Sequence, residues 1–397
     1  MNFHEIIPGV YYVGVNDRVT TRFEGLWPLP YGVSYNSYIV KGSEKIALVD
    51  TVEIGGARDF FSHIDAATGG VAPDYLIVNH MEPDHSGSIP LILKAFPGIK
   101  IVGNRQTLAM VKGFYHIDNP ENLLEIADGK ELSLGDKTLR FHLTPMVHWP
   151  ETMMTYLVED KVLFAGDAFG CFGTLNGAVL DENMDTERYF PEMYRYYSNI
   201  VGKYGRFVLA AFKKLEGVEL SYVCSTHGPV WHKELGKVVE IYQRLASGEW
   251  EDGVVIVYGS MYGNTAEMAD MIAGELAKRG VKKIEVFNAS FAEMSDMISA
   301  AFRYKGLIVG APTYSMSLFP PVKTFMDAMV TREVKNKVFA SFSSFTWASA
   351  ANKALSEYAD KLGWDHVATH DMKQSADETT AQAISALADA FMEAYSK

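Results

Sequence analysis

One run of six residues constrains this chain more than any other stretch. The run is His80-Met81-Glu82-Pro83-Asp84-His85, and it directly follows Asp74–Asn79, an apolar segment of strand length. Four of the six side chains are imidazoles or carboxylates, which can bind a metal ion. Charges packed this closely at the end of a strand repel one another unless a cation is present. The run therefore predicts a metal site, and a solvated surface turn is the alternative.

Three further candidate ligands follow strand-like segments later in the chain. His148, Asp167 and His227 each come after a short apolar segment, close to Gly or Pro. Any one of them alone would be an ordinary structural residue. Together with the run they form the series H-x-E-x-D-H…H…D…H, which is far more specific than its parts. We therefore expect one catalytic metal site built from His80, Glu82, Asp84, His85, His148, Asp167 and His227.

Length and composition set the broad class of the protein. A chain of 397 residues has room for two or three domains, and 48% hydrophobic content is ordinary for a globular protein. The net charge of −13 argues against nucleic acid or an anionic membrane as partner. No apolar run approaches the ~20 residues of a membrane-spanning helix, and the first five residues do not begin a secretory signal.

The two cysteines, Cys171 and Cys224, limit the redox chemistry of the chain. Nothing in the sequence needs a disulfide, so a reducing cytoplasm is the expected location. Rubredoxin-type and iron–sulfur centres need about four thiolates. A one-electron donor of that kind must therefore be a separate protein.

The pattern of the chain changes near residue 250. Up to about Gly248, short strand-like segments alternate irregularly with helical ones, whereas strands and helices alternate regularly after the polar stretch at 248–253. Five successive strand–helix units predict a doubly wound parallel sheet with helices on both faces. We therefore expect an α/β protein with two domains, 1–250 and 251–397.

The first strand of the second domain leads into a loop suited to a phosphate group. Gly259–Thr265 lies between the strand at 254–258 and a helix at 265–279. Backbone N–H groups, two hydroxyls and a helix N-terminus can bind an anion there without Lys or Arg. The absence of G-x-G-x-x-G argues against NAD or FAD. The candidate binding residues for flavin mononucleotide (FMN) in this loop are Ser260, Met261, Tyr262, Gly263, Asn264 and Thr265.

Two more loops are expected beyond the carboxyl ends of strands, where a doubly wound sheet binds its ligand. Their aromatic side chains can flank a flavin ring, and their hydroxyls and backbone can bind its edge. The first loop is Pro312, Thr313, Tyr314 and Ser315, and the second is Ser343, Ser344, Phe345, Thr346 and Trp347.

These motifs resemble two known families joined in one chain. The histidine and carboxylate series resembles the metallo-β-lactamase superfamily, with Glu82 where hydrolases of that superfamily have His, and residues 254–397 resemble flavodoxin. Replacing an imidazole ligand with a carboxylate makes the site more anionic, which favours iron over zinc. The combination resembles the flavodiiron proteins over essentially the whole chain. The resemblance implies an αββα sandwich followed by a flavodoxin-like domain.

The resemblance also implies a diiron centre and its ligands. His80, Glu82 and His148 would hold one iron, Asp84, His85 and His227 the other, and Asp167 would bridge them; some relatives leave the imidazole at His85 off the metal. Some family members have a histidine near the position of Glu24, which this chain lacks. Tyr196 and Tyr197 lie in a Tyr-rich segment, predicted helical, and are expected in the core.

The activity implied is reduction of dioxygen to water or of nitric oxide to nitrous oxide, with electrons passing through FMN to two iron ions. The same ligands serve both gases, so the sequence leaves the substrate open. The implied partners are a separate electron donor, with rubredoxin first and a flavin or deazaflavin reductant second, and a second copy in a head-to-tail homodimer or dimer of dimers. Two alternatives stand beside this interpretation: a zinc hydrolase with a regulatory flavodoxin-like domain, and an electron carrier with a structural metal domain.

Overall fold

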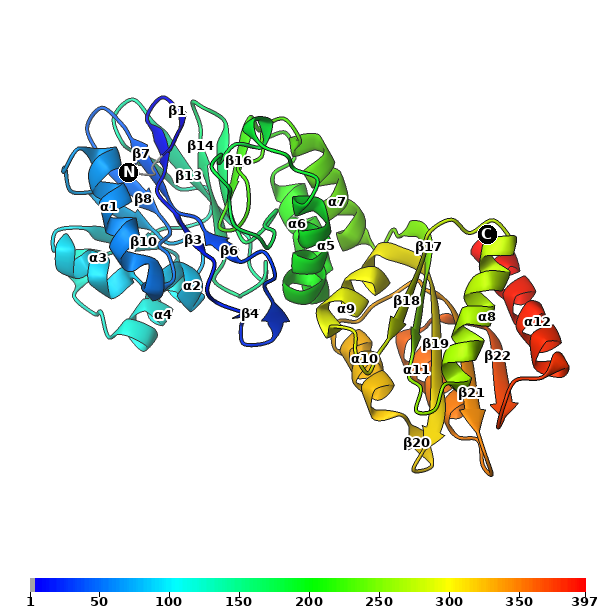
Figure 1. Cartoon of the computed structure of the whole chain (residues 1–397). Coiled ribbons are helices and arrows are strands. Elements are labelled where there is room, and N and C mark those ends of the chain that lie inside the picture. The colour runs from blue at the N-terminus through cyan, green and yellow to red at the C-terminus, as the bar shows by residue number, and fades with distance from the viewer. Residues whose placement is uncertain (1–3) are drawn as a thin grey trace. The chain divides into compact units, whose positions relative to one another are not determined.

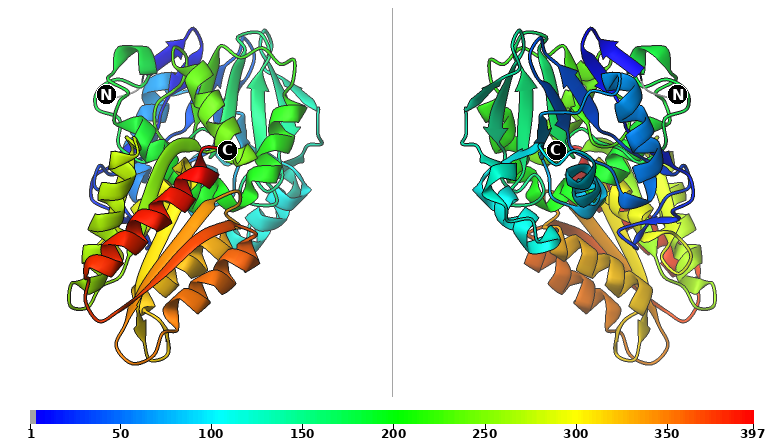
Figure 2. Two further views of the ribbon diagram at one scale, coloured as in Figure 1. Left: turned by 90° about the vertical axis from the view of Figure 1, so that its right-hand side faces the viewer. Right: turned by 90° about the vertical axis from the view of Figure 1, so that its left-hand side faces the viewer.

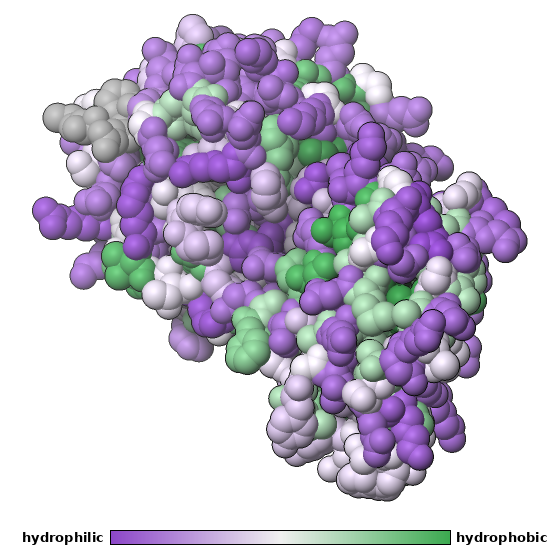
Figure 3. All heavy atoms as spheres, turned by 45° about the vertical axis from the view of Figure 1, so that its right-hand side comes forward, coloured by the Kyte–Doolittle hydropathy of each residue, from purple (hydrophilic) through white to green (hydrophobic). Residues whose placement is uncertain are grey.

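The computed structural model describes residues 4–397, and the chain divides into two compact units (Figure 1). The first unit runs to Gln243 and the second from Arg244 to Lys397. The division falls inside helix α7 (Leu235–Ser247), a little before the boundary expected at 250/251. Hydrophilic residues predominate on the face drawn in Figure 3. Within residues 4–397, no helix combines the length and the apolar character needed to cross a membrane.

Two packed β-sheets form the centre of the first unit. The larger contains, in spatial order, β1 (His4–Ile7), β2 (Val10–Tyr12), β7 (Tyr38–Lys41), β8 (Ile46–Val49), β9 (Tyr75–Ile77), β10 (Lys100–Gly103) and β11 (Leu123–Glu125). The smaller contains β12 (Glu131–Ser133), β13 (Thr138–Leu143), β14 (Met153–Leu157), β15 (Val162–Gly166) and β16 (Tyr222–Ser225). Two short ribbons complete the strands: β3 (Val15–Asp17) with β6 (Val33–Tyr35), and β4 (Arg22–Phe23) with β5 (Trp27–Pro28).

Helices cover the outer sides of the two sheets, which gives the expected αββα sandwich (Figures 1 and 2). Beside the larger sheet lie α1 (Ala57–Thr68), α3 (Ile89–Ala95) and α4 (Arg105–Tyr115). Beside the smaller sheet lie α5 (Tyr189–Tyr196) and α6 (Gly205–Lys214). A π-helix at Tyr197–Val201 and a 3-10 turn at Gly202–Tyr204 connect α5 to α6.

The central strands are buried on both faces, and this explains their continuous apolar sequence. Every residue of β8, β14 and β15 is buried, because one face of each meets the opposite sheet and the other meets helices. Strands β15 and β16 are parallel, and Phe164 pairs with Cys224. The residues that follow these two strands therefore leave the sheet at the same end.

The second unit is the doubly wound parallel sheet that the sequence predicted, and its strand order is the one found in flavodoxins. In spatial order it contains β18 (Ile284–Asn288), β17 (Glu251–Tyr258), β19 (Tyr304–Tyr314), β21 (Val338–Phe345) and β22 (Asp365–Lys373), with β20 (Ser317–Leu318) antiparallel to the end of β19. On one face, α8 (Asn264–Lys278) and α12 (Glu378–Tyr395) enclose a core around Ile256, Ile308 and Phe391. The remaining helices are α9 (Met294–Arg303), α10 (Pro320–Thr331) and α11 (Ala351–Leu362).

The structure corrects the boundaries of two expected loops. Pro312, Thr313 and Tyr314 belong to β19, and Ser343, Ser344 and Phe345 belong to β21. The parallel ladders run further than expected: β19 pairs with β21 as far as Pro312, and β21 pairs with β22 as far as Phe345. Ser, Thr and Pro are typical loop residues. Here they stand at the carboxyl ends of β19 and β21, where the chain faces a cavity rather than a core.

Candidate functional site

The run at 80–85 is more ordered than the turn expected from the sequence. His80 follows β9 after two residues, and Pro83–Ser86 form a short helix, α2. Pro83 occupies the first turn of this helix, where its fixed φ is favourable and its missing N–H costs nothing. The helix places Asp84 and His85 on consecutive positions beside the end of the strand.

A first ligand group consists of His80, Glu82, His148 and Asp167, all buried. Each offers one atom, and these four atoms lie within 4.8 Å of one another. His148 Nε2 lies 3.0 Å from Glu82 Oε2 and 3.0 Å from Asp167 Oδ2. His80 Nε2 lies 3.3 Å from Glu82 Oε2 and 3.5 Å from Asp167 Oδ2. The two imidazoles and two carboxylates therefore point at one centre.

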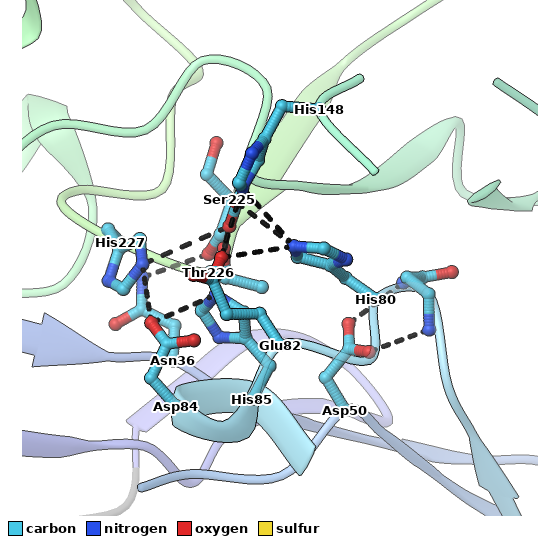
Figure 4. A network of polar contacts seen from close by, with 12 residues as sticks. Asn36, Asp50, His80, Glu82, Asp84, His85, His148, Ser225, Thr226 and His227 are labelled. Carbon is cyan, nitrogen blue, oxygen red and sulfur yellow. Dashed lines mark hydrogen bonds and ion pairs between the residues drawn. The ribbon is translucent and has the colours of Figure 1, made fainter. Parts of the chain in front are cut away.

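A second ligand group consists of Asp84, His85 and His227 (Figure 4). Asp84 Oδ2 lies 3.2 Å from His85 Nε2 and 3.3 Å from His227 Nε2. Asp167 also faces this group, because its Oδ1 lies 2.9 Å from His85 Nε2 and 3.9 Å from His227 Nε2. One oxygen of Asp167 thus faces each group, so the structure brings together all seven residues singled out in the sequence.

Several buried atoms at this centre have no hydrogen-bond partner within the described part of the chain. They are both carboxylate oxygens of Asp84, both ring nitrogens of His85, Oδ2 of Asp167 and Nε2 of His227. A buried polar atom without a partner costs about 1–3 kcal/mol, and more where it is charged. Cations at the two centres would satisfy Oδ2 of Asp84, Nε2 of His85, Oδ2 of Asp167 and Nε2 of His227. The carboxylate-rich donor set therefore fits two iron ions.

A second layer of residues orients the imidazoles. Glu151, fully buried, accepts a hydrogen bond from His80 Nδ1 over 2.8 Å and from the backbone N–H of Met81 over 2.9 Å. His227 Nδ1 donates to the carbonyl oxygen of Ser34 over 2.7 Å. Each bond fixes a proton on Nδ1 and leaves Nε2 free to face the centre.

No motif or spacing in the chain pointed to this second layer. Glu151 and Ser34 follow no pattern that separates them from ordinary polar residues, and their partners become visible only when the two sheets pack. Thr226, whose hydroxyl donates to Asp167 Oδ1 over 2.7 Å, could have been suspected because it precedes His227.

Two further polar side chains lie beside the metal-site residues: Glu24 borders the first ligand group, and Tyr196 borders His227. Glu24 lies in the β4–β5 turn and accepts a hydrogen bond from Trp27 Nε1 over 3.0 Å. Burial and the nearby carboxylate of Glu82 raise the pKa of Glu24 to about 7. The ring of Tyr196 lies 5.4 Å from that of His227, and its hydroxyl is buried. Tyr196 is therefore both a core residue and part of the wall of the site.

The flavin residues border a cavity of about 650 Å³ in the second unit. It lies at the carboxyl ends of the strands, and its volume is within the range of small-molecule sites. Of the predicted residues, Gly263 and Ser343 do not line it. Those that do are Ser260, Met261, Tyr262, Asn264, Thr265, Pro312, Thr313, Tyr314, Ser315, Ser344, Phe345, Thr346 and Trp347. Reasoning from sequence missed Met316, Ala348, Gln374 and Ser375.

The phosphate loop has the backbone that an anion site needs. Gly263 has φ +101° and precedes α8, and its N–H donates to Ser260 Oγ over 3.1 Å. Thr265 Oγ1 lies 2.8 Å from Ser344 Oγ, which joins the loop to β21. The cavity lining contains no Lys or Arg. The N-terminus of α8 is therefore the local positive field for a phosphate, and the cavity fits FMN.

Metal uptake should depend on pH because the imidazoles hold protons when no cation is present. Burial lowers the pKa of His148, but the carboxylates of Asp167 and Glu82, each 3.0 Å from its Nε2, outweigh burial and raise the pKa to about 9. The same carboxylates, with Glu151, raise the pKa of His80. Below these values a metal must displace protons, so its affinity falls as pH falls. Anaerobic titration of metal-free protein with Fe²⁺ should give at least about tenfold weaker binding at pH 6 than at pH 8. Equal affinity at both pH values would contradict this.

Comparisons with known proteins agree with the two-unit structure. Residues 33–228 match the family model described as ODP family beta lactamase, and residues 256–386 match the flavodoxin model. The anaerobic nitric oxide reductase flavorubredoxin of Escherichia coli O6:K15:H31 is 31% identical over 90% of this chain and 75% of its own length. The nitric oxide reductase of Moorella thermoacetica is 30% identical over 89% of this chain and 88% of its own.

Solved structures show the same similarity over the whole chain. The rubredoxin oxygen:oxidoreductase from Desulfovibrio gigas has a TM-score of 0.93 and 26% identity, with 100% of this chain and 99% of that chain covered. The flavodiiron protein from Giardia intestinalis has a TM-score of 0.93 and 26% identity, with 100% and 98% covered. The chain belongs to the flavodiiron protein family.

Proposed function

We propose that this chain is a flavodiiron oxidoreductase that reduces dioxygen to water, nitric oxide to nitrous oxide, or both. The observation that carries the proposal is the pair of ligand groups that share Asp167, in a chain that also has a flavin-sized cavity. His80, Glu82 and His148 would hold one iron and Asp84, His85 and His227 the other, with Asp167 between them. Two ferrous ions and reduced FMN together supply four electrons, which is the number that converts dioxygen to water.

The side chains around the metal residues have separate tasks in this proposal. Glu151 and the carbonyl of Ser34 hold the imidazoles of His80 and His227 with Nε2 facing the centre. Glu24 lies near the place in which some family members have a histidine, and it borders the site where protons are consumed, so proton delivery in this chain would involve a carboxylate rather than an imidazole.

The hydrolase alternative fits the residues less well. A zinc hydrolase of this superfamily favours neutral imidazoles and one activated water. Glu82 instead adds a buried carboxylate, and the second unit adds a cavity that hydrolysis does not need. Metal analysis after anaerobic purification separates the two, since the hydrolase would carry zinc alone. An electron carrier with a structural metal would consume neither gas.

The electron donor is a separate protein, with rubredoxin as the first candidate. The only two cysteines, Cys171 and Cys224, are buried free thiols, so this chain cannot build a four-thiolate iron centre. Free thiols also agree with a cytoplasmic location. Side-by-side anaerobic stopped-flow experiments with dioxygen and nitric oxide would decide the substrate, because the same ligands serve both.

Replacing the shared carboxylate should stop turnover. Asp167→Ala removes the side chain whose two oxygens face the two ligand groups, so we expect iron content to fall and gas consumption to drop by about 100-fold or more. Loss of a residue that merely orients a metal ligand already costs about 10–100-fold. Bound FMN should stay at the wild-type level. Exposed Asp185→Ala is the control. Normal oxidase and reductase activity in Asp167→Ala would be fatal to the assignment.

The phosphate loop should lose FMN when Gly263 is replaced. Gly263→Val forces a branched side chain into φ +101°, although the space around an added Cβ is open. The expected damage is therefore backbone strain in the loop and reduced access of the phosphate, and the purified variant should lack the yellow flavin spectrum. Gly274→Val, in the middle of α8 and also facing open space, is the matched control. A fully loaded Gly263→Val variant would contradict the expectation.

A homodimer is part of the proposal. Exposed apolar side chains surround the mouth of the flavin cavity, including Tyr262 (91% exposed), Trp347 (87%) and Met316 (62%). Family resemblance implies that this mouth faces the metal site of a second copy. Activity per chain should fall on dilution in step with the dimer fraction measured by analytical ultracentrifugation. Unchanged activity per chain where monomers prevail would contradict the dimer.

A further inference from the structure

A single carboxylate oxygen holds both ends of the segment that forms one wall of the flavin cavity. The segment, called the aromatic loop below, is residues 344–348, and all of its residues line the cavity. Ser343 precedes it and Ser349 follows it. Both hydroxyls donate hydrogen bonds to Oδ1 of Asp371, the second over 2.9 Å. Asp371 therefore closes the aromatic loop at its base without lining the cavity itself.

Asp371 Oδ1 also accepts a hydrogen bond from a third donor. Asn352, in the first turn of α11, donates from Nδ2 to Asp371 Oδ1 over 2.9 Å and to the carbonyl oxygen of His370 over 2.8 Å. Strand pairing sets the geometry, because Ser343 and Asp371 are partners in the parallel ladder between β21 and β22. Hydrogen bonds to an ionised acceptor are roughly twice as strong as neutral ones. The carboxylate thus joins β21, the aromatic loop and α11 to β22.

The aromatic loop begins with the last two residues of β21, Ser344 and Phe345, and continues beyond the end of that strand. The side chain of Trp347 is 87% exposed, and within residues 4–397 neither Trp347 nor Phe345 stacks on another ring. Its other polar contacts are Ser344 Oγ, which lies 2.8 Å from Thr265 Oγ1, and the carbonyl oxygen of Phe345, which accepts from the N–H of Gln374 over 2.8 Å. Just beyond the loop, the N–H of Ala350 donates to Thr313 Oγ1 over 3.0 Å. Thr265, Thr313 and Gln374 line the cavity, so their replacement would change flavin contacts directly, whereas Asp371 contacts the ends of the loop without lining the cavity.

We propose that Asp371 is a positioning residue for the flavin: it sets the conformation of the aromatic loop, and through it the affinity and the reduction potential of bound FMN. This rests on the proposed function, because it requires that the second unit binds FMN. Two routes connect the residue to the cofactor. The side chains of Phe345 and Trp347 would supply aromatic contact with the ring, and the backbone of the loop would be available to bind the ring edge.

The test compares FMN binding by whole chains stripped of flavin. Wild type, Asp371→Ala, Asp371→Asn and the control Asp365→Ala are titrated with FMN and followed by flavin fluorescence. Asp365 is an exposed residue at the start of the same strand. Loss of charge-assisted bonds should raise the Kd of Asp371→Ala about tenfold. Asp371→Asn, which keeps an acceptor oxygen, should recover most of the affinity, and Asp365→Ala should match wild type.

Potentials measured at saturating FMN separate positioning from a general loss of stability. The midpoint potential of Asp371→Ala should differ from wild type, whereas a variant that is merely less stable would keep the wild-type value once loaded. Wild-type affinity and potential in Asp371→Ala would overturn the proposal and leave the proposed function intact. Failure of the wild type to bind FMN would instead refute the proposed function. If Asp371→Ala does not fold, Ser349→Ala serves, and wild-type affinity and potential in Ser349→Ala would overturn the proposal.

Discussion

The first unit depends on how charge is balanced around one buried carboxylate. Asp167 is 1% exposed, and each of its oxygens faces a different group of imidazoles. Burial alone would keep this carboxyl neutral, yet the imidazoles of His85 and His80 outweigh burial and hold its pKa well below the usual value. Protons on those imidazoles can balance the charge when no metal is present, and cations balance it when metal is bound. The same geometry therefore serves folding and metal binding.

The sandwich is what allows these residues to meet. His80 and α2 follow a strand of the larger sheet, whereas Asp167 and His227 follow β15 and β16 of the smaller one. Neither sheet alone carries both ligand groups. Because β15 and β16 are parallel, their following residues emerge side by side, and the opposing sheet delivers the run at 80–85 to the same edge. Packing of two apolar sheet faces thus places buried charge at their common end.

The position of a residue could be predicted from the sequence where local features determine it, and could not where it depends on how the sheets pack. Most metal-site residues stood out because they come after an apolar strand segment, so local sequence and strand direction determine where they lie. His148 is different, because residues 144–147 form no strand and it lies in the connection between β13 and β14. Glu151 and Ser34 were missed because their contacts depend on how the two sheets pack. In the second unit, hydroxyl-rich segments suggested loops, but ladder pairing extended β19 and β21 through them. Gln374 has a left-handed backbone at the end of β22, for which no glycine or motif gave a signal.

Both sites are built at the ends of strands, but charge is balanced differently in the two. The metal-site residues carry buried charges that need an opposite charge nearby. They are oriented by hydrogen bonds to a carboxylate, a backbone carbonyl and a hydroxyl, whose positions are fixed by packing. The flavin cavity contains no cationic side chain and relies on backbone N–H groups at the start of α8. The position of a ligand in this cavity must therefore depend on the conformation of the surrounding loops rather than on ion pairs with side chains. Ser343, Ser349 and Asn352 all donate to Asp371, which does not line the cavity, and the role proposed for this carboxylate in setting the loop conformation meets that need.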